Sequence, residues 1–207
     1  MKRLLLSFVL SLALAVPASA TELVVSAAAS LTDAFTAMKA PFEAANPGTT
    51  VIFIFAASGS LFKQIEQGAP VDVFASADLK WMGEMVKAGF VAQDADKIFA
   101  VNGLVLAVPA GNPAGVKEMA DLKKDGVQRI ALGTPASVPA GSYAKLALTA
   151  SGEWAALEPK FVYAESVRQV VDYVARAEVE AGFVFATDAK KAGAKVAVSS
   201  VIPLKEP

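Results

Sequence analysis

Short apolar runs alternate with longer amphipathic segments along most of this chain of 207 residues. The runs LVVS at 23–26 and TVIFIF at 50–55 are continuous and rich in β-branched residues, as in strands that are buried on both faces. The segment at 31–46 instead repeats its apolar residues about every 3.6 positions, which predicts a helix. The expected strands are 23–26, 50–55, 71–76, 104–108, 129–133, 160–163, 181–185 and 195–200. The expected helices are 31–46, 60–68, 78–89, 116–123, 140–151 and 166–177, with a helical turn at 187–193.

This alternation predicts an α/β fold in which each sheet is mostly parallel and flanked by helices. Two series of strands and helices, joined by a crossover near residues 99–103, favour two lobes over one. We expect lobe I to span residues 21–102 and lobe II to span residues 103–199. In parallel sheets the strand carboxyl ends and the helix amino ends share one edge, so the ligand is expected in the cleft between the lobes.

The first twenty residues have the pattern of a cleavable export signal. Lys2 and Arg3 precede an apolar run, and the segment 17–20, Pro-Ala-Ser-Ala, ends in an A-x-A cleavage site. A membrane anchor is the weaker alternative, because about 13 apolar residues fall short of the roughly 20 that a spanning helix needs. We expect residues 1–20 to be a signal peptide, the mature chain to begin at Thr21, and the protein to work in the periplasm.

Cysteine and histidine are both absent from the sequence. Without cysteine there is no disulfide, so an exported domain of about 187 residues depends on its apolar core. Without histidine, Ser-His-Asp triads and the usual zinc and iron sites are excluded. Without Lys2 and Arg3 the chain has 17 basic and 20 acidic residues, a balance that argues against a nucleic-acid partner.

Several loops share one arrangement, in which a strand ends, small or hydroxyl residues follow, and a helix begins. The arrangement recurs at Ser30, at 58–60, at 140–142 and at 166–167. Free backbone N–H groups and the positive end of the helix dipole make each loop a potential anion site. The alternative is that each serine is only a helix N-cap, and Ser30 with Asp33 resembles an imperfect capping box.

The segment FAASGSLF at 55–62 is the clearest example. Ser58 is expected to face the ligand, Gly59 to let backbone N–H groups turn inward, and Ser60 to be a plain cap. The sequence has no P-loop string and no G-x-G-x-x-G fingerprint, so a small anion that is not a nucleotide fits better.

Two pairs of charged or polar residues allow competing interpretations. Lys63 and Arg168 lie just inside expected helices, where they either add positive field to an anion site or lie on a solvated face. Ser142 and Lys145 are three residues apart on one expected helix, which allows a secreted Ser-Lys hydrolase. Such spacing is common by chance, and nothing nearby in the sequence specifies a substrate pocket.

In these loops the chain resembles the periplasmic molybdate-binding proteins of ABC transporters. The likeness runs through AAASLTDAF, FAASGSLFKQIEQGAPVDVFASADLKWM, GTPASVPAGSYAKLAL, AESVRQVV and GFVFATDA, in that order. The resemblance implies a type II periplasmic-binding-protein fold, with two hinged α/β lobes that close on molybdate or tungstate. It further implies delivery of the oxyanion to a membrane permease, with no catalysis and no cofactor, and we expect a monomer.

The resemblance also implies the ligand set. The hydroxyls of Ser30 and Ser58 and the backbone N–H groups of Ala140 and Val167 would hold the molybdenum as molybdate. Where the family often has a tyrosine in G-x-V-Y-x-x-D-A, this chain has Phe185, which cannot donate a hydrogen bond. The loss of one donor to a charged ligand costs about 1.5–3 kcal/mol if nothing replaces it.

The length of the chain is a second departure from the resemblance. The family continues further, with elements that return to the first lobe, so residues 200–207 are expected to begin that return. The alternative ligand on the same fold is another oxyanion such as sulfate or phosphate, because discrimination between tetrahedral anions depends on the size of the cavity.

Overall fold

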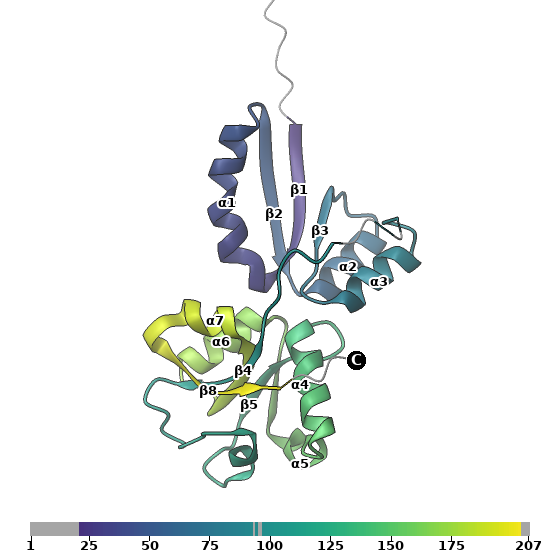
Figure 1. Cartoon of the computed structure of the whole chain (residues 1–207). Helices are drawn as coiled ribbons and strands as arrows, with labels where there is room; N and C mark the ends of the chain where they lie inside the picture. Colours follow the sequence, from purple (N-terminus) through teal and green to yellow (C-terminus); the bar gives the residue numbers. More distant parts are fainter. Residues whose placement is uncertain (1–20, 93, 95–96, 204–207) are drawn as a thin grey trace, which may run out of the picture.

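The structure is a computed structural model that describes residues 21–92, 94 and 97–203, and it contains two sheets with helices around each (Figure 1). The N-terminal sheet and its helices form lobe I, and the C-terminal sheet and its helices form lobe II. The expected export signal, residues 1–20, lies outside the described residues. Among the described residues, no helix is long and apolar enough to cross a membrane.

Lobe I has a three-stranded parallel sheet in the order β2-β1-β3. Its elements are β1 (Thr21–Ala28), η1 (Ala29–Leu31), α1 (Thr32–Ala45), β2 (Thr49–Ala56), α2 (Ser58–Glu66), β3 (Val73–Ala75) and α3 (Leu79–Lys87). Helix α1 packs beside β2, whereas α2 and α3 lie together on the side of β3 (Figure 1). All three strands therefore end at one edge of the sheet, the edge that faces lobe II.

Lobe II has a five-stranded sheet in the order β6-β5-β7-β4-β8. Its strands are β4 (Leu104–Pro109), β5 (Ile130–Gly133), β6 (Phe161–Ala164), β7 (Ala181–Phe185) and β8 (Val196–Ile202). Its α-helices are α4 (Pro139–Ala150), α5 (Trp154–Leu157), α6 (Val167–Ala175) and α7 (Ala186–Ala192). Short 3₁₀ segments complete it: η2 (Met119–Lys123), η3 (Glu158–Lys160) and η4 (Gly193–Lys195).

Strand directions in lobe II differ from the expectation of a mostly parallel sheet. β5 pairs in parallel with β6 and β7, but β4 is antiparallel to both β7 and β8, so this sheet is mixed. An apolar run buried on both faces has the same composition in either direction, which is why the sequence pattern does not reveal this reversal. The α/β class and the two lobes are confirmed.

The end of the described chain also differs from the expectation. Strand β8 continues to Ile202, where Ser200 pairs with Leu106 and Ile202 with Leu104 in the sheet of lobe II. A return to lobe I from residue 200 onward is therefore wrong for residues 200–202. Residues 204–207 lie outside the described part of the chain.

The apolar periodicity explains how lobe II forms its core. Every residue of β4 and β7 is buried, as the continuous runs LVLAV and AGFVF predict. Helix α6 buries Val167, Val170, Val171 and Val174, a spacing that places all four on one helical face against the sheet. The sheet thereby presents the carboxyl ends of β5, β6 and β7 toward lobe I.

Candidate functional site

Six strand ends, three from each lobe, meet at one small cavity. The cavity measures about 10 Å³ and lies where β1, β2 and β3 of lobe I face β5, β6 and β7 of lobe II. Its lining residues are Ala28, Ala29, Ser30, Ala57, Ser58, Ala77, Val138, Pro139, Ala140, Val167 and Phe185. The space accommodates a ligand of a few atoms at most, and no nucleotide or sugar in this arrangement of the lobes.

All five residues singled out from the sequence line this cavity: Ser30, Ser58, Ala140, Val167 and Phe185. They lie on five different loops, each between 18 and 82 positions from the next along the chain, and only folding brings them together. No side chain among the lining residues is ionisable. An anion in this cavity would therefore be held by neutral hydrogen-bond donors.

Ser58 is fully buried and its hydroxyl has one partner fixed. It is the first residue of α2, and its Oγ accepts a hydrogen bond from the N–H of Ala77 at 3.0 Å. A hydroxyl that accepts in this way keeps its hydrogen available to donate to a group in the cavity. The helix has no side-chain cap at Ala57, so Ser58 is not an N-cap.

Ser30 also lacks a capping role. It lies in η1, and the N-cap of α1 is Leu31, which makes no side-chain cap. Thr32, not Ser30, bonds locally, through its Oγ1 to the carbonyl of Ala29 at 2.8 Å. The capping-box interpretation of Ser30 with Asp33 is wrong, because the Asp33 carboxylate is turned toward cations of lobe II.

Two other expectations for the segment at 55–62 need correction. Ser60 lies inside α2 and does not cap it. The N–H of Gly59 does not turn into the cavity but donates to the carbonyl of Ser137 in lobe II at 3.0 Å. A Cβ at position 59 would lie 2.8 Å from the Cα and carbonyl oxygen of Ser137, so glycine is needed here for close approach of the two lobes.

Backbone donors of lobe II come from the first turns of two helices. Ala140 follows Pro139 at the start of α4, and Val167 is the first residue of α6. Within the described residues neither N–H has a hydrogen-bond partner. Both are orphan donors at the positive ends of helix dipoles, which is the geometry that suits an anion.

Glycine at position 141 fixes the placement of α4. A Cβ there would lie 1.8 Å from the carbonyl oxygen of Gly133, the last residue of β5. Helix α4 can therefore start directly on the end of its strand only with Gly141 in the VPAG segment. This close packing puts Ala140, which is fully buried, at the cavity wall.

Phe185 closes the cavity with an apolar face. Its ring is 5% exposed and packs edge-on against Tyr143, with ring centroids 6.4 Å apart. The side chain at this position supplies no hydrogen-bond donor, so the donors of lobe II at the cavity are backbone groups.

Three other residues considered from the sequence, Lys63, Ser142 and Lys145, lie outside the cavity lining. Lys63 is on a solvated face, where it pairs with Glu66 at 2.6 Å. Lys145 places its ammonium 5.1 Å from the centre of the Trp154 ring and forms no hydrogen bond with Ser142 within the described residues. Neither Ser142 nor Lys145 lines the cavity, so the geometry gives no support to a Ser-Lys nucleophile.

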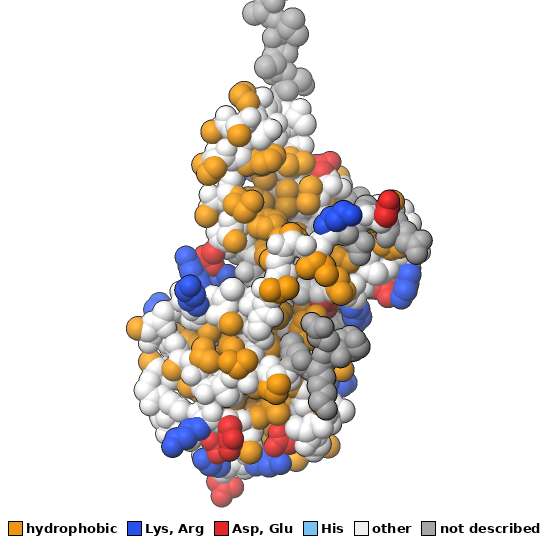
Figure 2. Space-filling view, in the orientation of Figure 1, with side chains coloured by type: hydrophobic (Ala, Val, Ile, Leu, Met, Phe, Trp, Pro, Cys, Tyr) orange, Lys and Arg blue, Asp and Glu red, His pale blue; other side chains and the backbone are white. Residues whose placement is uncertain are grey.

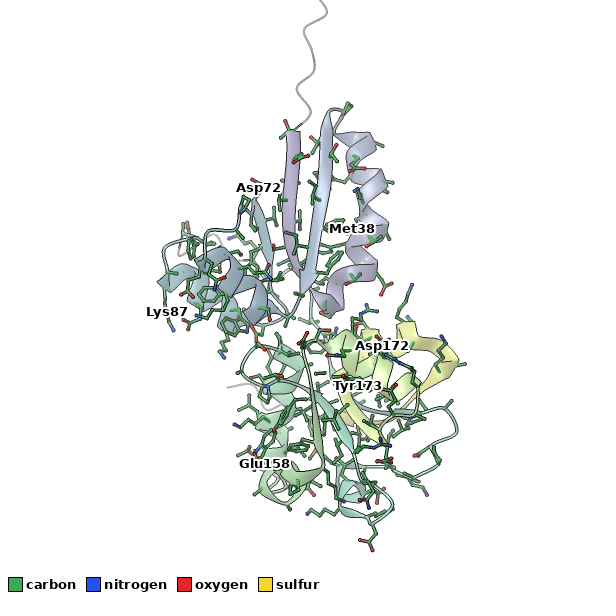
Figure 3. All side chains as sticks on the ribbon, turned by 180° about the vertical axis from the view of Figure 1, so that it is seen from behind. Met38, Asp72, Lys87, Glu158, Asp172 and Tyr173 are labelled. Atoms are coloured by element: carbon green, nitrogen blue, oxygen red, sulfur yellow. The ribbon has the colours of Figure 1, made fainter. Side chains whose placement is uncertain are left out.

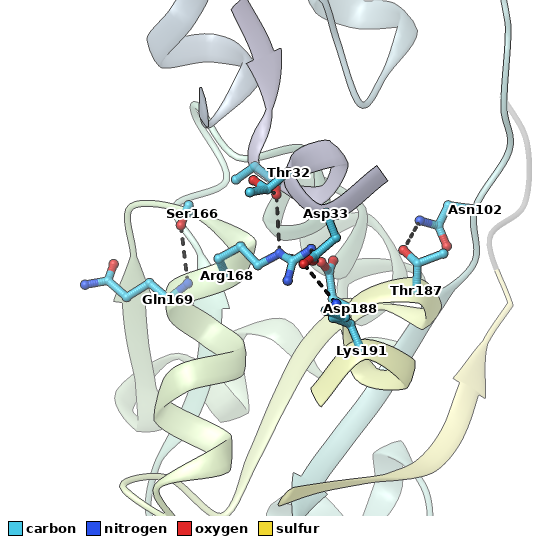
Figure 4. A network of polar contacts seen from close by, with 10 residues as sticks. Thr32, Asp33, Asn102, Ser166, Arg168, Gln169, Thr187, Asp188 and Lys191 are labelled. Atoms are coloured by element: carbon cyan, nitrogen blue, oxygen red, sulfur yellow. Dashed lines mark hydrogen bonds and ion pairs between the residues drawn. The ribbon is translucent and has the colours of Figure 1, made fainter. Parts of the chain in front are cut away.

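Arg168 lies next to the cavity and connects the lobes (Figure 4). Its Nε is 3.0 Å from Asp188 Oδ1 in lobe II and 3.3 Å from the carbonyl oxygen of Ala29 in lobe I. Its Nη2 is 2.5 Å from Asp33 Oδ2, and Lys191 Nζ is 3.2 Å from Asp33 Oδ1. Sequence reasoning could not decide whether Arg168 was solvated, because its partners lie far away in the chain.

Burial and nearby cations shift the pKa values of the two carboxylates in this network in opposite directions. Asp188 is fully buried, and the loss of solvation raises its pKa to about 6, although the charge of Arg168 acts in the opposite direction. For Asp33, partial burial also acts to raise the pKa, but hydrogen bonds and charges from Arg168 and Lys191 outweigh it and hold the pKa below its ordinary value.

Two α/β lobes around a cavity lined by neutral donors define the class of two-lobed solute-binding proteins. The family model for bacterial extracellular solute-binding proteins matches residues 23–207, and the chain belongs to this family. The molybdate-binding protein ModA of Haemophilus influenzae is 36% identical over 84% of this chain and 69% of its own length. That of Escherichia coli is 39% identical over 87% of this chain and 72% of its own length.

The solved structure of the periplasmic molybdate-binding protein of Azotobacter vinelandii superposes with a TM-score of 0.69 and 28% identity. The match covers 79% of this chain and 71% of that one. Across the curated relatives, this chain spans 64% to 72% of their length.

Proposed function

We propose that this chain binds molybdate in the cavity between its lobes and serves as the solute-binding protein of an ABC importer. The observation that carries the proposal is the convergence of Ser30, Ser58, Ala140 and Val167 on one small cavity without a charged side chain. Relatives at 36% and 39% identity that are named molybdate-binding proteins support the choice of ligand.

Neutral donors suit a protein that must both capture and release a dianion. Two hydroxyls and several backbone N–H groups can replace the hydration shell of the oxyanion, which offsets the cost of its burial. The lobes can then open without separating an ion pair between ligand and protein. Tungstate, which has the same shape and charge, is expected to bind at the same donors.

The proposal includes the cellular setting. Residues 1–20 would direct export and be removed before Thr21, and the mature monomer would carry the oxyanion through the periplasm to a membrane permease. Lobe I would comprise residues 21–102, and lobe II would begin at residue 103 and include strand β8 as far as Ile202. The protein would catalyse no reaction and use no cofactor, and the bound molybdenum is cargo.

Calorimetric titration of the purified protein with molybdate, tungstate, sulfate and phosphate tests the ligand. Molybdate and tungstate are expected to bind at one site per chain, with sulfate and phosphate much weaker. Tighter binding of sulfate or phosphate would show that one of these anions, and not molybdate, is the ligand. No heat with any of the four anions would refute the proposal.

Ser30→Ala tests the site itself. The hydroxyl of Ser30 has no partner within the described residues, so its removal should leave the free energy of unfolding within about 0.5 kcal/mol of wild type. The affinity for molybdate should fall by about 1.5–3 kcal/mol, the worth of a hydrogen bond to a charged group. Ser60→Ala, on the same edge but outside the cavity lining, is the matched control and should bind like wild type.

A further inference from the structure

The cation and carboxylate groups beside the cavity come from three helices and both lobes. Asp33 is on α1 of lobe I, Arg168 is on α6, and Asp188 and Lys191 are on α7 of lobe II. Within the described residues, Asp33 meets no cation from its own lobe in these contacts: both of its partners are across the cleft. The network is therefore an interlobe contact and not a surface pair within one helix.

Arg168 bonds the very loop that carries Ser30. Its guanidinium reaches the carbonyl oxygen of Ala29, the residue before Ser30, while its own backbone follows Val167 directly. One side chain thus fixes the distance between a hydroxyl donor of lobe I and a backbone donor of lobe II. Asp188 of lobe II holds Arg168 in this orientation, because the Asp188 side chain is fully buried and its Oδ1 lies 3.0 Å from Arg168 Nε.

The same helix α7 also contacts the crossover between the lobes. Asn102 Nδ2 donates to Thr187 Oγ1 at 2.8 Å (Figure 4). The N–H of Ala186 donates to the carbonyl of Gly103 at 2.8 Å. The crossover segment, at 97–103, is where the described chain passes from one lobe to the other (Figure 1). Rotation of lobe I about this segment would separate Asp33 from Arg168 and Lys191 while α7 stays with lobe II.

We propose that Asp33, Arg168, Asp188 and Lys191 form a closure latch, in which Arg168 is the positioning residue that holds the Ser30 loop over the N-terminus of α6. The latch touches no ligand and acts on the equilibrium between open and closed lobes. Its effect on affinity comes through the fraction of closed protein. Only the measurement of molybdate exchange rests on the proposed function, whereas the measurement of lobe distances without ligand does not.

Asp33 is the residue to change. Asp33→Asn keeps the size of the side chain and leaves Arg168 paired with Asp188, so no buried charge loses its partner. Removal of Arg168 instead would strand the buried Asp188 carboxylate and disturb the fold of lobe II. Asp33→Glu restores the charge and serves as the conservative variant, and Glu66→Gln removes an ion pair of similar length within α2 as the matched control.

The first readout is the distance between the lobes in the absence of ligand. The chain has no cysteine, so spin labels attached through Lys87→Cys in lobe I and Glu158→Cys in lobe II are specific, and both positions are exposed (Figure 3). Asp33→Asn should move part of the distance distribution to longer values, whereas Asp33→Glu and Glu66→Gln should leave it as in the parent. Identical distributions for Asp33→Asn and the parent would overturn the latch.

The second readout is molybdate exchange kinetics. Asp33→Asn should raise the dissociation rate constant about fivefold, because the lobes around bound molybdate open more often once the ion pairs of Asp33 across the cleft are lost. Failure of the wild-type protein to bind molybdate would refute the proposed function. The spin-label distances, which are measured without ligand, would still show whether the latch exists. Wild-type dissociation kinetics in Asp33→Asn would refute the latch alone.

Discussion

Lobe II has a continuous apolar core that runs from β4 through β7 to the faces of α4 and α6, whereas the apolar contacts of lobe I are divided into two small clusters. One cluster comprises Val25, Ala27, Val51 and Ala75, and the other comprises Phe62, Ile65, Trp81 and Met85. Helix α1 has no buried residue, and both Met38 and Phe42 are exposed. Figure 2 shows apolar side chains spread over this face of lobe I.

The two lobes also supply the cavity in different ways. Lobe I provides side-chain hydroxyls, from Ser30 and Ser58, and lobe II provides backbone N–H groups, from Ala140 and Val167, together with the apolar ring of Phe185. Backbone donors at the ends of well-packed strands are held rigidly by the core beneath them. The donors of lobe I are supported by two smaller apolar clusters and depend more on contacts across the cleft. We therefore expect lobe I to unfold before lobe II.

The largest expected effect on the free energy of unfolding comes from a large-to-small substitution in the core of lobe II. Phe183 is fully buried in β7, and Phe183→Ala should lower the free energy of unfolding by about 3–5 kcal/mol. Phe42→Ala, at an exposed position of α1, should change it by less than about 0.5 kcal/mol.

Two tryptophans allow the lobes to be followed separately in urea. Trp81 is in α3 of lobe I and Trp154 in α5 of lobe II, and the chain has no other. In single-tryptophan variants, Phe183→Ala should shift the Trp154 transition to lower urea more than the Trp81 transition. Equal shifts of both transitions would mean that the lobes unfold as one unit and that their cores do not differ in this way.

The buried carboxylate of Asp188 gives the next largest effect, and it depends on pH. Its pKa in the folded protein is about 6, against an ordinary 3.8, so the folded state binds the proton more tightly than the unfolded chain. This group therefore destabilises the fold progressively as pH rises from about 4 to about 6, by on the order of 2–3 kcal/mol in total. Well below pH 3.8, the carboxyl is protonated in both states and this cost disappears.

Asp188→Asn isolates that cost, since asparagine does not titrate. The free energy of unfolding of Asp188→Asn minus that of wild type should increase between pH 4 and pH 7 and level off above, measured by urea unfolding at several pH values. Ser60→Ala, which removes no titratable group, is the control and should show no such trend. A difference independent of pH would show that Asp188 is not buried enough in solution to shift its pKa.

The local order of elements and the loops of the site were accessible from the sequence. The run TVIFIF predicts a strand at 50–55 and the structure has β2 at Thr49–Ala56, because a continuous apolar run is a local signal. Loop chemistry pointed to the loops of Ser30, Ser58, Ala140 and Val167, and the resemblance added Phe185; all five residues line the cavity. What could not be predicted depends on distant partners: the antiparallel direction of β4, the bond of Gly59 to Ser137, and the place of Arg168 between Asp33 and Asp188.

The smallest expected effect tests whether lobe II lacks a side-chain donor for the ligand. Phe185→Tyr adds a hydroxyl at a position that lines the cavity and is 5% exposed. If that hydroxyl reaches the oxyanion, molybdate affinity should rise about threefold to tenfold, which is less than the full worth of a charged hydrogen bond because the new group must also be desolvated. Tyr143→Phe is the matched control, since it removes a hydroxyl from the neighbouring ring, which lies outside the cavity lining, and it should leave affinity unchanged. Titration calorimetry of both variants decides the point. Unchanged affinity in Phe185→Tyr would show that the four donors already satisfy the ligand, and that the absence of a side-chain donor in lobe II does not lower affinity.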